Sequence, residues 1–521
     1  MPLDDFDVDL LRQVSRYLKR VEELATSEEA SRRTPLGDVV SSHLGADARS
    51  LAVITEEIQP HRLVDADIAL DVLADESRDT AGQGVRLLGV SGGDQRFHVS
   101  VGELIANPHT SFAPGPVSFV ARATGPDSSR RVVSFGLRLL DVEGSRLIVL
   151  QRDAAPQFGR VGASLEVIAA DEAVVPVFLA RLRDLMVERS VLRGHVLSFT
   201  ATEYGQEAGA TFLRRPTVAA DEVILGEGVL DRVVDHVVGI GEHRDELIAA
   251  GQHLKRGLLL YGPPGTGKTM TVRHLLARTP EVTAVLLTGS SIQFVSAAAE
   301  IARTFQPSIV VLEDIDLVAM ERSYSPQPLL FEVLDALDGL DGDADVAFVM
   351  TTNRVQVLER ALATRPGRVD LGVEIPLPDQ AARRRLFRRY ASGLPFSDAA
   401  LDDAADRAEG TTGSFAKELI RRSVLGAALR SEQPDDADLI AALDTLLSSG
   451  EALTRLLLSG DGGDIEDDED MGQGFFDEGT DIVTTRQMWE SQGRTSQGGP
   501  EGATWREPSG PWEGDDEVHV R

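Results

Sequence analysis

The residues best suited to chemistry form a glycine-rich run, Gly262-Pro-Pro-Gly-Thr-Gly-Lys268-Thr269. Its spacing fits a phosphate-binding loop, and it lies between an apolar strand predicted over 257–261 and a helix predicted over 270–278. Glycines let backbone N–H groups point at phosphates, and the helix N-terminus adds partial positive charge. We expect Lys268 to neutralise the β- and γ-phosphates of a nucleotide and the Thr269 hydroxyl to bind Mg²⁺.

Carboxylates and an asparagine follow two further apolar runs. The run 309–312 leads into Glu313 and Asp314, and the run 347–350 leads into Asn353. Parallel strands end at the edge of a sheet where nucleotides bind. One carboxylate could hold the water shell of Mg²⁺, the next could orient an attacking water, and the amide could bond that water or the γ-phosphate. Each residue alone could equally cap a helix, and it is their order after the phosphate loop that favours a hydrolytic site.

Two arginines flank a turn in Arg365-Pro-Gly-Arg368. A guanidinium is always charged and can donate two hydrogen bonds to phosphate oxygens. A single arginine is more often a solvated surface residue. Here the Pro-Gly pair fixes the turn and the spacing of both side chains.

From Asp221 to about Arg430 the chain resembles the ATPase module of AAA proteins. Besides the phosphate loop, the matching text is Thr-Thr-Asn-Arg at 351–354, Arg-Pro-Gly-Arg-Val-Asp at 365–370 and Ile-Pro-Leu-Pro-Asp at 375–379. The resemblance implies ATP hydrolysis with Mg²⁺ and a homohexameric ring that holds ATP between subunits. It also implies that Glu313 and Asp314 are the Walker B pair, that Asn353 is sensor 1, and that Arg365 and Arg368 are arginine fingers reaching a neighbour's site.

The same resemblance implies a set of nucleotide contacts and metal ligands. Gly413-Ser-Phe-Ala416 is similar to the Gly-x-x-Ala form of sensor 2, and Glu222-Val-Ile-Leu225 takes the place of the segment that contacts the base. Thr269 and, through water, Glu313 are expected at Mg²⁺. The residues expected to contact nucleotide are Ile224, Gly262, Pro263, Pro264, Gly265, Thr266, Gly267, Lys268, Thr269, Met270, Gly413 and Ala416.

The Walker B pair departs from the usual AAA order of Asp followed by Glu. Glu313-Asp314 resembles instead the subgroup of the mitochondrial Rieske-protein translocase, which has a similar Arg-Pro-Gly-Arg-Val-Asp sequence. The shorter Asp314 argues against a high turnover while still supplying a base. No apolar run long enough for that subgroup's membrane anchor occurs in this sequence.

Phe294-Val295-Ser296 occupies the place of the family's pore loop, with Ser where Gly is usual. If Phe294 faces a pore, the ring threads polypeptide. The alternative is that Phe294 is a core residue.

The positions of these motifs divide the chain into regions. We expect an α/β AAA module with a parallel sheet, preceded by helical and β-rich parts and followed by a helical lid. Residues 1–80 show helical periodicity, for example at Val14 and Tyr17, and β-branched and aromatic runs such as 97–101 and 196–199 follow, with one helix predicted over 174–188. The predicted regions are 1–80 helical, 81–215 β-rich recognition domain, 216–380 large AAA subdomain, 381–459 helical lid and 460–521 disordered acidic tail.

The tail carries 17 acidic and four basic residues and all three tryptophans. Such composition predicts disorder. It could serve as a solubilising tail, or Trp489, Trp505 and Trp512 could lie in short docking motifs.

Charge and composition narrow the possible functions. The 521 residues carry a net charge of −32, which argues against binding nucleic acid or anionic membrane, and the absence of cysteine excludes disulfides and thiol nucleophiles. The acidic start of the chain differs from a signal peptide, so we expect a cytoplasmic protein.

Two functions fit: a Mg-ATP-driven ring that unfolds, translocates or remodels protein clients as a chaperone does, or a non-threading scaffold whose nucleotide state gates partner binding. Neither reading identifies the client.

Overall fold

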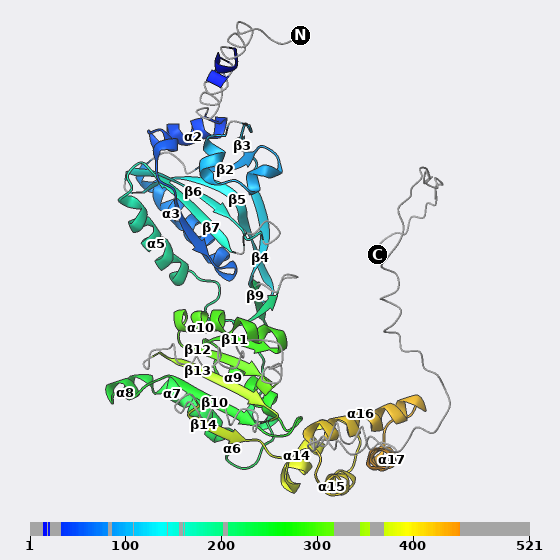
Figure 1. Ribbon diagram of the computed structural model, residues 1–521. Helices are drawn as coiled ribbons and strands as arrows, with labels where there is room; N and C mark the ends of the chain where they lie inside the picture. The colour runs from blue at the N-terminus through cyan, green and yellow to red at the C-terminus, as the bar shows by residue number, and fades with distance from the viewer. Residues whose placement is uncertain are drawn as a thin grey trace, which may run out of the picture. The chain divides into compact units, whose positions relative to one another are not determined.

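The computed structural model describes residues 14–17, 19–20, 33–81, 86–107, 109–142, 144–155, 160, 162–201, 207–316, 344–354 and 369–448. They contain an amino-terminal module, a second sheet with its helices, and a carboxy-terminal group of helices (Figure 1). Arg365, Arg368 and the expected acidic tail lie outside these ranges. None of the described helices combines the length and apolar character needed to cross a membrane.

The amino-terminal module is built on an antiparallel sheet in the order β1-β7-β6-β5-β2-β3, with β4 paired to β5. Its strands are β1 (Ile54–Ile58), β2 (Arg86–Ser91), β3 (Ala113–Gly115), β4 (Ser118–Gly125), β5 (Ser128–Val142), β6 (Ser145–Arg152) and β7 (Ala163–Ala169). Its helices are α2 (Pro35–Leu44), α3 (Leu63–Ala81), α4 (Val101–Ile105) and α5 (Val174–Glu188), with short 3₁₀ turns at Ala48–Ser50, Pro60–Arg62 and Asp94–Phe97.

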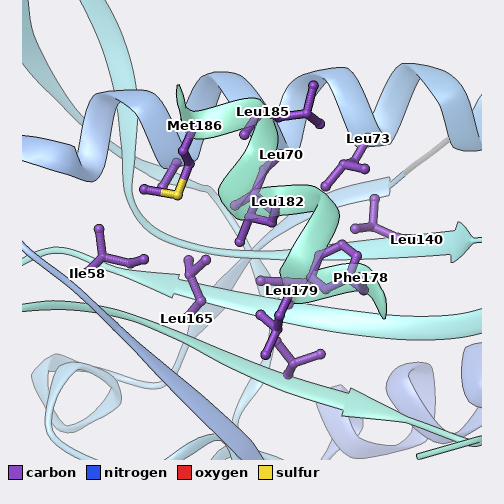
Figure 2. Close-up of a cluster of buried hydrophobic side chains, with 14 of the residues drawn as sticks. Ile58, Leu70, Leu73, Leu140, Leu165, Phe178, Leu179, Leu182, Leu185 and Met186 are labelled. Atoms are coloured by element: carbon purple, nitrogen blue, oxygen red, sulfur yellow. The ribbon is translucent and has the colours of Figure 1, made fainter. Parts of the chain in front are cut away.

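The central strands of this sheet are buried on both faces, as β6 illustrates, where successive side chains point to opposite sides. In β6, Leu147 and Val149 join the core under α3 and α5, whereas Ile148 and Leu150 join the core under α2 and α4. Figure 2 shows the first of these cores, where apolar side chains of α5 meet those of α3 and the sheet. The labelled residues are Ile58, Leu70, Leu73, Leu140, Leu165, Phe178, Leu179, Leu182, Leu185 and Met186.

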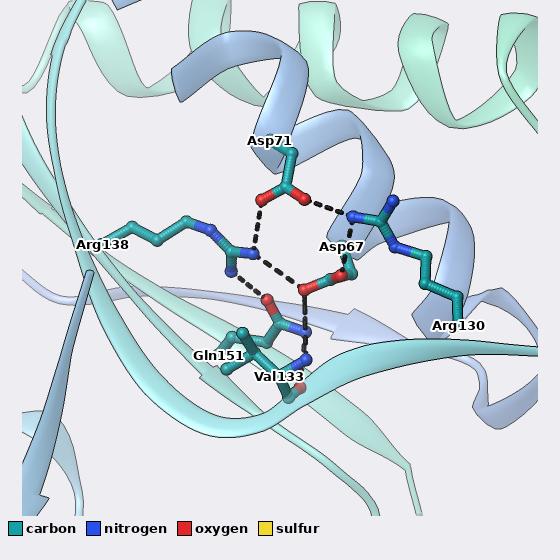
Figure 3. A network of polar contacts seen from close by, with 6 residues as sticks. All are labelled: Asp67, Asp71, Arg130, Val133, Arg138 and Gln151. Atoms are coloured by element: carbon teal, nitrogen blue, oxygen red, sulfur yellow. Dashed lines mark hydrogen bonds and ion pairs between the residues drawn. The ribbon is translucent and has the colours of Figure 1, made fainter. Parts of the chain in front are cut away.

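A network of buried charges joins α3 to the sheet (Figure 3). The Arg138 guanidinium donates to Asp67 at 2.8 Å and to Asp71 at 3.0 Å, and it also bonds the Gln151 side chain. The Asp67 carboxylate further accepts the Val133 N–H at 3.2 Å. Arg138 and Asp67 are only 2% and 1% exposed, so their mutual contacts replace the water that each has lost.

The second sheet has the order β14-β10-β13-β12-β11-β8-β9. All neighbours are parallel except β8 and β9. Its strands are β8 (Val196–Ala201), β9 (Glu207–Leu213), β10 (Arg256–Tyr261), β11 (Thr283–Thr288), β12 (Ser308–Glu313), β13 (Val346–Thr352) and β14 (Leu371–Glu374). The central strands β10, β12 and β13 are almost wholly buried, as expected for a parallel sheet covered on both faces.

Helices cover both faces of this sheet (Figure 1). Side chains of α10 (Val295–Thr304) pack on one face and those of α9 (Lys268–Arg278) on the other. The other helical segments that the described part of this region contains are the 3₁₀ turns Ala220–Glu222 and Gly289–Phe294, α6 (Val229–Val234), a π-helical turn (Asp235–Gly239), α7 (Ile240–Glu242) and α8 (Arg244–Ala249).

Four helices follow the second sheet, in the range predicted for a helical lid. They are α14 (Gln380–Tyr390), α15 (Asp398–Arg407), α16 (Gly413–Leu429) and α17 (Asp436–Leu447). Each begins after a Ser, Thr or Asp whose side chain accepts a backbone N–H of the first turn. Phe387, Leu401, Phe415 and Leu439 belong to their shared apolar core.

Three features differ from the sequence-based prediction. The runs predicted as one helical and one β-rich region form a single module, since β1 of the first pairs with β7 of the second. The run 196–199 forms β8 beside β11, so the second sheet begins before the expected boundary at 215. The predicted strand 97–101 is wrong, because Ser100 caps α4 and the residues before it form a 3₁₀ turn.

The periodicity near the amino terminus also predicted a buried helical face. Residues 14–17 are helical, but Val14 is 46% exposed and Tyr17 is 69% exposed. The predicted burial is therefore wrong for these two residues, and the other apolar positions of the pattern lie outside the described residues.

Candidate functional site

The glycine-rich run forms a tight loop between β10 and α9. Gly262, Gly265 and Gly267 all have positive φ, at 145°, 76° and 114°. A Cβ at Gly262 would lie 2.2 Å from the Ile375 carbonyl oxygen, and one at Gly265 would lie 2.7 Å from the Ser414 hydroxyl oxygen. Only glycine can follow this path, which brings backbone N–H groups to the start of a helix, where phosphates bind.

Lys268 lies buried at the first residue of α9. Its ammonium donates to the carbonyl oxygens of Gly262 at 2.7 Å and Pro263 at 2.8 Å. Burial lowers the pKa of Lys268 to about 8, while the charges of Asp314 and Asp316 act in the opposite direction. A phosphate arriving at the loop would favour the charged ammonium in the same way as these carboxylates.

Thr269 and Glu313 suit a magnesium ion. The Thr269 hydroxyl bonds the Glu313 carboxylate, and burial raises the pKa of Glu313. The other carboxylate oxygen, Oε1, is buried with no hydrogen-bond partner. Within the described ranges no three His, Asp or Glu side chains gather as a metal site. A hard cation that takes one hydroxyl, one carboxylate, phosphate oxygens and water fits these donors.

Asp314 and Asn353 lie together at the ends of β12 and β13. The Asn353 side-chain amide donates to Asp314 Oδ1 at 3.2 Å. Asp316, directly beyond, accepts the Thr352 hydroxyl at 3.0 Å and the Asn353 N–H at 3.2 Å. The structure thus brings together Asp314 and Asn353, which the sequence placed after two separate strands.

A cavity of about 840 Å³ lies over the loop, within the size range of small-molecule sites. It has walls from both the second sheet and the four-helix group. Its lining residues are Glu222, Val223, Ile224, Pro264, Gly265, Thr266, Gly267, Lys268, Thr269, Met270, Asp314, Asn353, Pro378, Leu386, Arg389, Tyr390, Ser392, Gly413, Ser414 and Lys417.

Most of the nucleotide contacts predicted from the sequence line this cavity, with three exceptions. Gly262 and Pro263 are not among the lining residues, and their carbonyl oxygens bond Lys268 instead. Ala416 is 1% exposed and packs in the apolar core of the four helices. Of the motif Gly413–Ala416, it is Gly413 and Ser414 that line the cavity.

Sequence reasoning missed several polar residues of the cavity wall. Arg389 of α14 pairs with Glu222 at 2.8 Å, so an ion pair links the helical group to the segment between β9 and β10. Lys417 and Tyr390 also line the cavity. Lys417 follows Gly413 by one helical turn, a spacing that could have been read from the sequence, whereas the pairing of Arg389 depends on the fold.

Phe294 and Val295 differ from the expected exposed pore loop. The Phe294 ring lies 5.7 Å from the Phe199 ring of β8, and Val295 is fully buried at the start of α10. The segment Gly289–Phe294 is a 3₁₀ turn that continues into α10 with Ser296 in its first turn. Phe294 is only partly buried and packs against the apolar core of the second sheet, which supports the core alternative in part, and its role in a pore loop stays a prediction.

The comparisons with known proteins agree with this geometry. Residues 258–377 match the family described as ATPase family associated with various cellular activities (AAA). The chain is 33% identical over 249 residues to the ATP-dependent zinc metalloprotease FtsH 2 of Sphaerobacter thermophilus, covering 44% of this chain and 37% of the relative. It is 28% identical to the proteasome-activating nucleotidase of Methanospirillum hungatei, covering 62% of this chain and 80% of the relative.

A solved structure described as "Structural Basis for Katanin Self-Assembly" covers 44% of this chain and 84% of its own, with 28% identity and a TM-score of 0.36. The chain spans less than half the length of the first curated relatives that it matches. It contains an AAA ATPase domain, a kind of domain that binds ATP with Mg²⁺ and hydrolyses it.

Proposed function

We propose that this protein hydrolyses Mg-ATP as part of a hexameric ring and uses the cycle to remodel protein partners. The observation that carries the proposal is the cavity shared by the second sheet and the four helices. A nucleotide held there contacts both parts, so loss of its γ-phosphate can change how the helices lie on the sheet. Related proteins include the ATP-dependent zinc metalloprotease FtsH 2 and a proteasome-activating nucleotidase, and both names refer to protein degradation machinery.

The residues of the site divide the chemistry between them. The loop amides and Lys268 bind the phosphates, and Thr269 with Glu313 would hold Mg²⁺, which withdraws charge from the phosphate oxygens when bound. Asp314 accepts a proton from the attacking water, and Asn353 orients that water or the γ-phosphate. The Glu-Asp order supports kinship with the Rieske-protein translocase subgroup, which we retain as part of the proposal.

Arg365 and Arg368 are proposed to complete the site of a neighbouring subunit. A trans-acting arginine can be worth about 10³–10⁵ in rate in related phosphoryl transfers. Mixed rings test this: Arg365→Ala/Arg368→Ala subunits combined with Lys268→Ala subunits should recover hydrolysis at interfaces that join an intact loop to an intact finger. Mixtures without activity, from parents that each assemble, would exclude action between subunits.

The remodelling itself is tested with a trap. Asp314→Asn protein should hold ATP and retain clients, and Lys268→Ala protein, which cannot bind ATP, serves as the matched control. A client captured only by the trap is then purified and mixed with wild-type protein. Loss of the client's native structure or complex that requires ATP supports remodelling, and an unchanged client argues against it.

A second candidate, a non-threading scaffold gated by nucleotide, is favoured by the packing of Phe294. The Phe294 ring packs against Phe199. In α10, the helix that follows Phe294, the Glu300 carboxylate accepts a hydrogen bond of 2.5 Å from the Gln59 side chain of the amino-terminal module. Nucleotide-dependent shifts of α10 would then reach the amino-terminal module. Phe294→Ala separates the two candidates: a threading ring loses client processing and keeps hydrolysis, whereas a scaffold keeps both hydrolysis and nucleotide-dependent partner binding.

A further inference from the structure

Asp314 has an unusual backbone conformation. Its φ is +53°, and among the described residues the only other non-glycine residue with positive φ is Ser431. The left-handed region is unfavourable for most side chains, although Asp and Asn enter it more readily than others. Such a conformation persists only where the surroundings impose it, and it occurs often at active sites.

Thr351 of β13 holds this conformation. Strands β12 and β13 pair in register up to Leu312 and Met350, and Glu313, which still pairs with Thr288 of β11, lies beyond that pairing. The Asp314 N–H, one residue further on, donates to the Thr351 hydroxyl oxygen at 3.0 Å. Thr351 is 1% exposed, so water cannot take the place of its hydroxyl as the acceptor of the Asp314 N–H.

The direction of the Asp314 carboxylate follows from this bond. With its N–H held by Thr351, Asp314 presents Oδ1 to the side-chain amide of Asn353 at 3.2 Å. Its charge also reaches Lys268 at the phosphate loop. A backbone free to relax toward the ordinary right-handed region would point the carboxylate elsewhere.

We propose that Thr351 is a positioning residue that aims the Asp314 carboxylate at the attacking water. The inference deepens the proposed function and rests on it. It also explains the reversed Walker B order in physical terms. A left-handed backbone favours Asp over Glu at position 314. The shorter Asp side chain can still contact the attacking water, because the hydrogen bond to Thr351 fixes the position of the Asp314 backbone.

Thr351→Val tests the assignment, since Val has a similar shape and cannot accept the Asp314 N–H. We expect kcat for ATP hydrolysis to fall at least about tenfold, within the range for a displaced base, while the Kd for ATP stays within about twofold. Thr351→Ser keeps the hydroxyl and should retain kcat within about twofold. If Thr351→Val does not fold, Thr351→Ala removes the same acceptor with a smaller side chain.

Thr283→Val is the matched control. Thr283 is also 1% exposed in the same sheet, and its hydroxyl accepts the Gly194 N–H at 3.0 Å, away from the cavity. We expect this variant to lower the melting temperature in the same way as Thr351→Val and to leave kcat unchanged. A loss of kcat in both variants would mean that kcat follows stability, which would overturn the inference.

The Asp314→Asn background gives the sharpest test. If Thr351 acts through the Asp314 carboxylate, adding Thr351→Val to Asp314→Asn should change kcat by less than about twofold. A further tenfold loss, or a Thr351→Val single variant with wild-type kcat, overturns the assignment. A wild-type protein that does not hydrolyse ATP would instead refute the proposed function, so the two failures are distinguishable.

Discussion

The amino-terminal module and the nucleotide-binding region both bury charged groups, but they differ in whether those groups have hydrogen-bond and ion-pair partners. In the module, Arg138 and Asp67 bind each other at 2.8 Å and fill their remaining positions with Gln151 and a backbone N–H. In the nucleotide region, Glu313 keeps a buried oxygen without a hydrogen-bond partner, and Asp314 adopts a left-handed backbone. Buried polar groups that are fully hydrogen-bonded to one another stabilise a fold, whereas buried groups that lack a hydrogen-bond partner remain free to bind a ligand.

The largest effect should come from Lys268→Ala. Removing the ammonium deletes the main positive charge in the loop, so we expect ATP affinity to fall by more than about 100-fold and hydrolysis to become undetectable. Circular dichroism should show a folded protein. Micromolar ATP binding by this variant would mean that the phosphates lie elsewhere.

On the other side of the comparison, Arg138→Met should affect stability rather than nucleotide chemistry. It removes the nearer of the two guanidinium groups that contact the buried Asp67 carboxylate and leaves only Arg130, at 3.4 Å. Breaking a buried ion pair typically costs about 3–5 kcal/mol of unfolding free energy. Asp71→Asn is the control, because the Asp71 carboxylate is half exposed and keeps part of its hydration, so we expect a smaller loss of unfolding free energy. Urea denaturation measures both. Equal, small losses would show that the network contributes little to the fold.

The depressed pKa of Lys268 predicts a pH dependence of ATP binding. Only the protonated ammonium attracts phosphate, so the Kd for ATP should rise as pH increases above about 8, by up to about tenfold per pH unit. Lys268→Arg, which stays charged, should show a flat profile over pH 7–9.5, however weakly it binds. Calorimetry should also detect proton uptake when ATP binds the wild type near pH 8.5. Parallel profiles for the two proteins would contradict this.

The smallest effect, and the most specific to the comparison, concerns Glu313→Gln. Because burial already raises the pKa of Glu313, a neutral amide should stabilise the nucleotide-free protein slightly, by on the order of 1 kcal/mol, while weakening the Mg²⁺ dependence of ATP binding. Melting temperatures with and without Mg-ATP report both changes. If the nucleotide-free variant is instead less stable than wild type, the Glu313 charge stabilises the fold, as the Arg138 and Asp67 charges do in the amino-terminal module.

The sequence predicted the two regions unequally, for physical reasons. The phosphate loop and the strands β10, β12 and β13 follow from strict local spacing, so the sequence could place Lys268, Asp314 and Asn353 at one edge of the sheet. The module depends on pairing between distant segments such as β1 and β7, which no local pattern reveals. The hydrogen bond from Asp314 to Thr351 depends on a single φ angle and could be found only in the structure.

Single-turnover hydrolysis by wild-type and Asp314→Asn protein at saturating Mg-ATP tests the proposed chemistry most directly. We predict that the wild type hydrolyses ATP and that Asp314→Asn binds it with a Kd within about twofold of wild type but reacts about 10²–10⁴-fold more slowly, as expected when a well-placed base is lost. A wild-type protein that binds ATP without hydrolysing it would contradict the proposal that this protein is an ATPase. A loss of less than about tenfold in Asp314→Asn would move the base to Glu313 or Asp316.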